Sequence, residues 1–213
     1  MDFQKDVARS LLTIGAVGFK PKEPVTFKSG IKSPVYVDNR RFPFWPQEWH
    51  KVIGGFKALI EQDSIEFDVV AGVEAAGIPH SAALGFFINK PSVFVRKEAK
   101  DHGLKKRVEG GDVAGKKVLL VEDLVSTGMS SLSVVEALRA EGAIVQDELI
   151  IITYGMKEAV SAFAQAGVKL HALTNFPVVL EEAVLMKKLA QDEKVSVEDW
   201  LSDPHGWAQT KGF

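Results

Sequence analysis

Apolar residues recur at helical spacing at the start of the chain, and this spacing soon changes. The first run predicts a helix over residues 2–14. Two short apolar stretches, at residues 25–28 and 35–38, then predict strands separated by a turn. A second helical pattern follows, for which Pro46 is a suitable first residue. Because the two short strands precede the main run of strands, we expect residues 1–45 to form a small N-terminal lobe, called the hood below.

From residue 67 onwards, runs of β-branched and Leu residues alternate with helical patterns. Such runs, without regular polar positions, are typical of strands buried on both faces of a parallel sheet. The predicted strands cover residues 67–71, 92–96, 117–123, 149–154 and 168–174. The helical patterns between and after them cover about residues 78–89, 129–141, 156–166 and 178–190. The alternation predicts an α/β fold with a mostly parallel central sheet, flanked by helices and connected by right-handed crossovers.

The length of 213 residues fits one domain with a sizeable core. We expect a single domain over residues 1–213, in which the hood is followed by a core over about 46–190 and a C-terminal tail over 191–213. The tail contains two tryptophans, Trp200 and Trp207, and is expected to pack as a short helix plus coil.

The composition limits the class of protein. Hydrophobic residues make up 46% and charged residues 25% of the chain, and no apolar run approaches the roughly 18 residues that span a bilayer. The N-terminus is acidic and lacks the basic head of a signal peptide, so a cytoplasmic protein without a membrane partner is expected. The absence of cysteine excludes a disulfide framework, a thiolate nucleophile and a Cys-ligated metal. A net charge of −2 argues against nucleic acid as a partner.

Positive charge is concentrated at residues 96–107, where six Lys and Arg residues accompany two acids. The local net charge is +4, which leaves −6 for the rest of a chain whose net charge is −2. This asymmetry suits a small, highly anionic ligand bound at one place. The segment belongs to a polar stretch of about twenty residues between two predicted strands, which is long for an idle connection. On the residues alone, a mobile lid over an active site and a solvated charged loop are both consistent with it.

The segment VLLVEDLVSTGMSS, residues 118–131, carries the most specific chemical pattern. Its apolar run predicts a buried strand, so Glu122 and Asp123 should lie at the carboxyl end of the sheet, where ligands bind in open α/β folds. Residues 126–130 predict a turn whose N–H groups and hydroxyls converge on a phosphate at the start of a helix. Because two carboxylates repel a phosphate, we expect them to accept hydrogen bonds from ribose hydroxyls or to hold hydrated Mg²⁺.

Two other interpretations of this segment stay open on the residues alone. It could be an ordinary strand, turn and helix with a serine at the helix N-cap. A receiver domain of a two-component system also has a first strand that ends in a carboxylate pair. Such a domain needs a phospho-acceptor Asp at the end of a later strand, and the strands predicted at 149–154 and 168–174 end without one.

Two further segments each allow two interpretations. Basic and aromatic residues around a Ser-Gly turn, in TFKSGIKSPVYVDNRR at residues 26–41, suit either an exposed hairpin or a ligand-covering one. The glycines of GVEAAGIP, residues 72–79, allow either close approach to an anion or close packing at the start of a helix.

Residues 118–130 resemble the phosphoribosyl-diphosphate (PRPP) binding motif of type I phosphoribosyltransferases. That motif has four apolar residues, two acids, two apolar residues and a Ser/Thr-Thr-Gly loop, and Met129 stands where a glycine or small residue is usual. RKEAKDHG, residues 96–103, is similar to the catalytic loop of the orotate phosphoribosyltransferases in particular. The Lys-Ser-Gly-x-x-Ser-Pro pattern at residues 28–34 resembles the hood of the same family. Residues 72–79 match the position of its diphosphate loop, with Ala76 where some members have Lys.

The resemblance implies the type I phosphoribosyltransferase fold and a pentosyltransferase activity. Orotate and PRPP would give orotidine 5′-monophosphate and diphosphate, a step of pyrimidine (UMP) biosynthesis. Mg²⁺ is the implied cofactor, held mainly through PRPP with Glu122 or Asp123 reaching it through water. The implied assembly is a homodimer in which the lid loop reaches the neighbouring subunit's site.

Site residues are carried over by the same resemblance. The implied catalytic residues are Lys100, His102 and Asp123. The implied PRPP-binding residues are Lys28, Arg96, Lys97, Lys100, His102, Glu122, Asp123, Leu124, Val125, Ser126, Thr127, Gly128, Met129 and Ser130. The implied orotate-binding residues are Ser126, Tyr36 and Tyr154. At position 154 many relatives place an Arg, and a phenol cannot offer the bidentate cationic fork of that residue.

Two alternatives share the PRPP motif. A phosphoribosyltransferase for a purine would keep residues 118–130, although it would not be expected to carry RKEAKDHG. A non-catalytic PRPP-binding regulator would lose the lid chemistry and would normally add a basic region for nucleic acid. The remaining histidines match no motif and are expected to be structural or exposed; they are His50, His80, His171 and His205.

Overall fold

A six-stranded sheet forms the centre of the computed structural model, which describes residues 3–27, 29–98 and 106–213. In spatial order its strands are β10 (Lys169–Asn175), β9 (Ile144–Thr153), β8 (Lys117–Val125), β5 (Val69–Val73), β6 (Ser92–Val95) and β7 (Val108–Glu109). Neighbouring strands are parallel except β6 and β7, which are antiparallel. The predicted α/β fold with a mostly parallel sheet is confirmed, and the short edge strand β7 is an addition that the sequence pattern did not predict.

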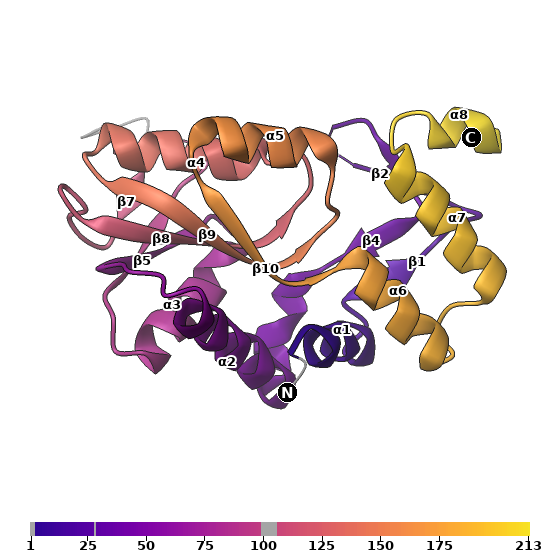
Figure 1. Cartoon of the computed structure of the whole chain (residues 1–213), viewed down its shortest axis with the longest axis horizontal. Coiled ribbons are helices and arrows are strands. Elements are labelled where there is room, and N and C mark those ends of the chain that lie inside the picture. The colour runs from indigo at the N-terminus through magenta and orange to yellow at the C-terminus, as the bar shows by residue number, and fades with distance from the viewer. Residues whose placement is uncertain (1–2, 28, 99–105) are drawn as a thin grey trace.

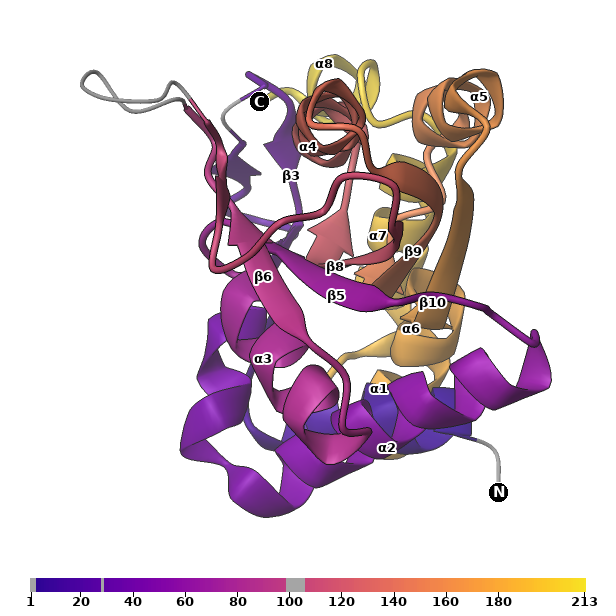
Figure 2. The same ribbon diagram turned by 90° about the vertical axis from the view of Figure 1, so that its left-hand side faces the viewer.

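Helices cover both faces of this sheet. One face carries α1 (Phe3–Thr13), α2 (Pro46–Gln62) and α3 (Gly77–Phe87), and the other carries α4 (Met129–Ala140) and α5 (Lys157–Ala166) (Figure 1, Figure 2). Residues 118–122 of β8 and 149–152 of β9 are all buried as a result. A strand covered on both faces needs apolar side chains on both, which explains the continuous apolar runs of the sequence.

The hood contains two antiparallel strand pairs, β1 (Val17–Phe19) with β4 (Val35–Val37), and β2 (Val25–Thr26) with β3 (Lys32–Ser33). The strands predicted at 25–28 and 35–38 are therefore not each other's partners. Their true partners are strands of two or three residues, which are too short to show a repeat in the sequence. A 3₁₀ helix, η1 (Asn39–Phe44), then connects β4 to α2.

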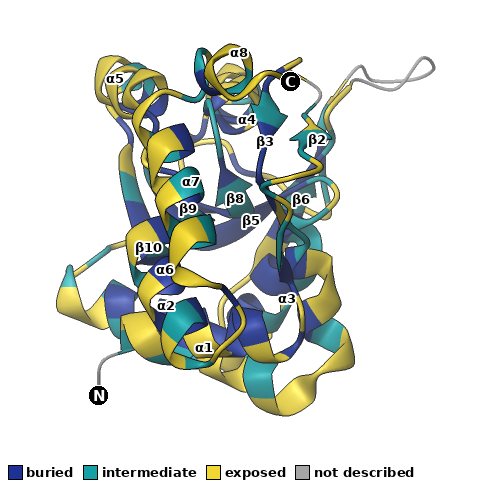
Figure 3. Ribbon diagram, turned by 90° about the vertical axis from the view of Figure 1, so that its right-hand side faces the viewer, coloured by how far each residue is buried: buried dark blue, intermediate teal, exposed yellow. Residues whose placement is uncertain are grey.

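The C-terminal tail packs beside the hood. It follows α6 (Phe176–Leu185) and forms two helices, α7 (Gln191–Ser202) and α8 (Trp207–Lys211), where one short helix was predicted. The Trp200 side chain is fully buried, and its indole N–H donates to the Lys32 carbonyl oxygen of β3 at 2.9 Å. Figure 3 shows the buried positions of α6 and α7 alternating with exposed ones along each helix. None of the helices in the described ranges has the length and apolarity to cross a membrane.

The strand order reverses direction between β5 and β8. From β5 the chain passes through α3 to β6 on one side, whereas from β8 it passes through α4 and α5 to β9 and β10 on the other. The loops that leave the carboxyl ends of β5 and β8 therefore diverge and leave a crevice, which is where open α/β sheets bind ligands. Both loops belong to segments in which the sequence indicates chemistry.

Candidate active site

The loop after β8 turns directly into α4 and exposes the start of that helix. Gly128 adopts the left-handed conformation, with φ +85°, and α4 begins at Met129. A Cβ at Gly128 would lie 2.9 Å from the ring of Phe163, so a larger residue would have to displace α5. The Gly128 carbonyl accepts the Leu132 N–H at 3.0 Å, but the N–H groups of the first turn have no partner within the helix. The loop thus presents free N–H donors at the positive end of a helix, as an anion site requires.

Two details of this loop settle points that the sequence left open. The N-cap residue is Gly128, so the interpretation as a serine-capped helix start is wrong. The side chain of Met129 is 70% exposed, so its extra bulk relative to the usual small residue points to solvent and does not crowd the loop.

The loop after β5 lies directly against β8. A Cβ at Gly77 would collide with the carbonyl oxygen of Val121, and one at Gly72 would collide with the Ser81 hydroxyl. The peptide bond between Glu74 and Ala75 is cis. These two glycines are therefore required for packing at the start of α3, which is the second of the two interpretations above. The close contact also fixes the loop at the crevice beside β8.

The two carboxylates of β8 have different surroundings. Glu122 is buried, and its Oε1 accepts the backbone N–H of Asp123 at 2.9 Å. Burial, with the nearby Asp123 and Glu148 carboxylates, raises the pKa of Glu122 well above its ordinary value. Asp123 is only half-buried; burial raises its pKa too, while hydrogen bonds and the Arg40 cation oppose the rise. Asp123 is therefore the less buried residue of the pair.

A third acid supports this site from behind. Glu148 of β9 is fully buried, and its Oε1 accepts the hydroxyl of Ser131 in the first turn of α4 at 2.6 Å. Burial raises the pKa of Glu148 to about 8, so the carboxyl group holds its proton at neutral pH. It thereby ties the first turn of α4 to the sheet without adding a charge beneath residues 126–130, the expected phosphate loop.

The hood closes over the carboxyl end of β8 through η1. The buried Asn39 donates from Nδ2 to the Asp123 carbonyl oxygen at 3.0 Å. Arg40 donates from Nε to Asp38 at 2.6 Å and from Nη2 to the Tyr36 hydroxyl at 3.3 Å. The structure thus brings the predicted Tyr36 to the same place as Asp123. It also adds Asn39 and Arg40, which the sequence motifs did not single out. Both residues lie in the 3₁₀ helix after β4, so no strand alternation in the sequence points to them.

Tyr154 lies at the carboxyl end of β9 within an aromatic cluster. Its ring stacks on Phe176 at a centroid distance of 4.5 Å and meets Trp200 edge-on at 5.2 Å, with Phe27 at 5.9 Å. Only 5% of the residue is exposed, and burial raises the pKa of its phenol, with Asp123 adding to the rise. Tyr154 is therefore an uncharged residue close to Asp123, and most of its surface packs against the neighbouring aromatic rings.

Besides Arg40, two described cations near the crevice come from the end of β6. Arg96 is half-buried, and its Nε is buried without a hydrogen-bond partner among the described residues. The Lys97 N–H donates to the Glu74 carboxylate at 2.9 Å, which holds this segment beside the loop after β5. The predicted Lys28, Lys100 and His102 lie outside the described residues, so their roles stay predictions.

Comparison with known proteins identifies the family. Residues 45–154 match the family model described as a phosphoribosyl transferase domain. The orotate phosphoribosyltransferase of Listeria monocytogenes serotype 4b is 40% identical over 98% of this chain and 100% of its own length. That of Cytophaga hutchinsonii is 39% identical over 97% of this chain and 99% of its own. The crystal structure of the enzyme from Aeropyrum pernix superposes with a TM-score of 0.75 at 30% identity, covering 84% of this chain and 98% of that one. The chain belongs to the orotate phosphoribosyltransferase family.

Membership in this family resolves the remaining interpretations of the PRPP motif. A receiver domain is excluded, and the type I phosphoribosyltransferase fold predicted from three separate motifs is confirmed. Of the PRPP-binding residues expected for an orotate phosphoribosyltransferase, Val125 is buried and Leu124 partly buried. These two can contribute backbone groups, whereas the loop from Ser126 to Ser130 leads into the free N–H donors of α4.

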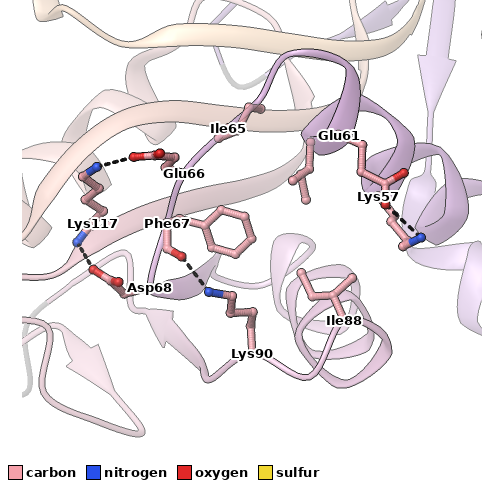
Figure 4. Close-up of a pocket in the computed structure, with 10 residues that line it drawn as sticks. Lys57, Glu61, Ile65, Glu66, Phe67, Asp68, Ile88, Lys90 and Lys117 are labelled. Carbon is pink, nitrogen blue, oxygen red and sulfur yellow. Dashed lines mark hydrogen bonds and ion pairs between the residues drawn. The ribbon is translucent and has the colours of Figure 1, made fainter.

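A cavity lies at the amino ends of β5 and β8, at the opposite end of these strands from the crevice. It has a volume of about 550 Å³, and its apolar lining includes Ile65, Phe67 and Ile88 (Figure 4). Each of its lysines already has a partner: Lys57 with Glu61, Lys117 with Glu66, and Lys90 with the Phe67 carbonyl oxygen. Its positive charge is therefore compensated, and it lies where β5 and β8 begin, away from their carboxyl ends.

Proposed function

We propose that this protein transfers the 5-phosphoribosyl group of PRPP to orotate, releasing diphosphate and forming orotidine 5′-monophosphate for pyrimidine biosynthesis. One observation carries the proposal. At the switch point of the sheet, the phosphate loop and carboxylates of β8 are faced by Tyr36 and Arg40 of the hood. A sugar phosphate and an aromatic base can thus be held on opposite sides of one reacting carbon.

The start of α4 binds the 5′-phosphate. Gly128 turns the chain so that the N–H groups of the first turn point outward, and the hydroxyls of Ser126, Thr127 and Ser130 can add donors. Glu148 keeps this turn fixed through Ser131. Because these donors are preorganised, they need not be reoriented when PRPP arrives.

Asp123 and Glu122 stabilise the ribose as positive charge develops on it. Displacement at the anomeric carbon passes through an oxocarbenium-like transition state, so the protein needs no covalent nucleophile. Asp123 is the less buried residue of the two and accepts hydrogen bonds from the ribose hydroxyls. Glu122 is turned onto the Asp123 N–H and acts by holding that residue in position.

Cations from the loops neutralise the departing diphosphate. Arg96 brings a buried guanidinium N–H without a partner in the described chain, which a phosphate oxygen can satisfy. Lys97 is held at the same edge by Glu74. Lys28, Lys100 and His102 complete this set in our proposal, with the lid excluding water from PRPP during transfer.

The residues of this site fit an Mg²⁺ ion that arrives with PRPP. No cluster of three or more potential ligand side chains is found among the described residues. Mg²⁺ usually keeps several waters and binds through one or two carboxylates and substrate phosphates. Asp123 would hold the ion through water, and the ion would neutralise charge on the diphosphate. A cytoplasmic location stays a prediction.

We also propose that the protein acts as a homodimer. Aromatic side chains are exposed at the start of α2 and the end of α3, where Phe44 is 82% exposed, Phe86 is 91% exposed, and Trp45 and Phe87 are about half exposed. Large exposed aromatic residues are costly in a monomer and are enriched in protein interfaces. A second subunit would cover them.

An absorbance assay tests the reaction directly. Purified protein is given PRPP and Mg²⁺ with orotate, uracil, adenine, hypoxanthine or xanthine in separate reactions. We expect consumption of orotate alone. Turnover of a purine would contradict the base assignment. Binding of PRPP without turnover of any base would instead support a non-catalytic regulator.

A further inference from the structure

Arg40 is a cation that the proposed mechanism leaves without a substrate partner. Its Nε donates to Asp38 at 2.6 Å and its Nη2 to the Tyr36 hydroxyl at 3.3 Å. The third nitrogen, Nη1, has no hydrogen-bond partner in the part of the chain that the structure describes, and 62% of the side chain is exposed. The guanidinium is thus held on two sides, while a remaining edge faces solvent and is free to bind a ligand.

The position of Arg40 is fixed relative to the reacting end of β8. Its neighbour Asn39 is fully buried and donates to the Asp123 carbonyl oxygen at 3.0 Å, so η1 cannot move away from β8 without breaking this bond. The charge of Arg40 opposes the rise in the pKa of Asp123, which places the two side chains within electrostatic reach of each other. Arg40 therefore lies near Asp123 at the crevice.

Orotate needs a cation that the rest of the described base side does not provide. It is a pyrimidine with a carboxylate on its ring, so its site must bind an anion as well as an aromatic face. Tyr36 is neutral, Tyr154 is buried and neutral, and Asp123 repels a carboxylate. The planar guanidinium of an arginine can bind a carboxylate through two parallel N–H bonds, which a tyrosine cannot do.

We propose that Arg40 binds the ring carboxylate of orotate and so selects orotate over uncharged pyrimidines. The inference rests on the proposed function and concerns how that function gains its specificity. In this arrangement the Tyr36 hydroxyl and Asp38 orient the guanidinium before the substrate arrives. The same arrangement places the base against the aromatic ring of Tyr36.

The test compares Arg40→Gln and Arg40→Lys with Arg41→Gln. Arg41 is the adjacent residue, has the same charge, and donates from Nη1 to the Gly15 carbonyl oxygen, away from Asp123. For each variant we would measure kcat, the KM for orotate and the KM for PRPP. We would also measure inhibition by the methyl ester of orotate, which has the same ring without the negative charge. Circular dichroism and urea unfolding would show that each variant is folded.

In Arg40→Gln we expect the KM for orotate to rise about 10- to 100-fold, the range for loss of a hydrogen bond to a charged group. The KM for PRPP should stay within about twofold, and inhibition by the methyl ester should change little, since neither involves the carboxylate pair. The KM of Arg40→Lys for orotate should lie between those of Arg40→Gln and the wild type, because lysine keeps the positive charge but cannot form two parallel N–H bonds. The kcat and both KM values of Arg41→Gln should match those of the wild type.

Other outcomes would overturn the inference in distinguishable ways. A rise in the KM for PRPP with an unchanged preference for orotate over its ester would assign Arg40 to the diphosphate. If binding of orotate and of its ester weakens equally, the role of Arg40 is to hold the Tyr36 side chain in position and not to bind the carboxylate. If the wild type does not turn over orotate, the proposed function fails before Arg40 is tested.

Discussion

Replacing Gly128 with alanine should damage both the fold and PRPP binding, because this residue meets two separate constraints. Its φ of +85° lies in the left-handed region, where an alanine costs roughly 1–2 kcal/mol. The added Cβ would also lie 2.9 Å from the ring of Phe163, and overpacking of this kind costs roughly 1–3 kcal/mol. We expect the free energy of unfolding to fall by about 2–4 kcal/mol, since Phe163 can relax in part.

Gly115 provides a matched control for the first constraint. It also has a positive φ, +71°, but a Cβ there would meet no atom within 4 Å. Gly115→Ala should therefore lose only the conformational part, about 1–2 kcal/mol. The difference between the two losses in the free energy of unfolding measures the energetic cost of the contact with Phe163 of α5.

Urea unfolding and initial-rate kinetics check the two effects separately. The N–H donors of the phosphate loop follow directly from Gly128, so Gly128→Ala should raise the KM for PRPP about tenfold or more, since small displacements of positioning groups are costly. Gly115→Ala should leave that KM unchanged. The reasoning fails if both variants lose the same stability and neither changes the KM for PRPP.

Three other parts of the site can be tested in the same way. Lys100→Ala should lower kcat by orders of magnitude with little change in Tm. If the lid acts across a dimer, mixing Lys100→Ala subunits with Asp123→Asn subunits should restore about a quarter of wild-type activity. No recovery of activity would mean that the lid acts only in its own subunit. Because burial raises the pKa of Glu148 from 4.5 to about 8, the folded protein holds an extra proton between these values and should lose stability as pH rises through them. Glu148→Gln should remove that part of the slope of Tm against pH, and an unchanged slope would disprove the assignment. Trp200→Phe should lower the free energy of unfolding by about 1–3 kcal/mol, because a buried hydrogen bond to the hood is lost. The same variant should raise the KM for orotate more than the KM for PRPP. Equal changes in both KM values would contradict a role of Trp200 on the base side.

The central sheet could be predicted from the sequence because each long strand carries its own signal. Strands buried on both faces require apolar runs, and β5, β6, β8 and β10 lie close to their predicted positions. The strand β9 begins five residues before its predicted start, because its first half carries polar residues such as Gln146 and Asp147. The strands β7, β1 and β3 have only two or three residues, which cannot establish a period, whereas the stretches around β2 and β4 were predicted. Their positions depend on partners distant in the chain, as β1 with β4 shows.

The site divides along the same line. The PRPP loop and its carboxylates are contiguous, so residues 118–130 revealed them as one motif. The contact between Asn39 and Asp123 joins residues 84 positions apart and depends on how η1 turns after β4. Nor does the sequence show that Glu122 is buried while its neighbour is accessible, since adjacent carboxylates differ only in where the folded strand places them.

Tyr154 and Arg40 can be understood as two results of one packing arrangement. The Tyr154 ring is enclosed by Phe176, Trp200 and Phe27, which links the sheet to the tail and the hood. An arginine at this position would have to bury a guanidinium among aromatic rings, and an uncompensated buried charge is strongly destabilising. The aromatic cluster therefore excludes a cation from the end of β9. A cation that binds the carboxylate of a base must then come from another side of the crevice. The hood forms that side, and its half-exposed Arg40, already oriented by Asp38, can supply the charge without being buried.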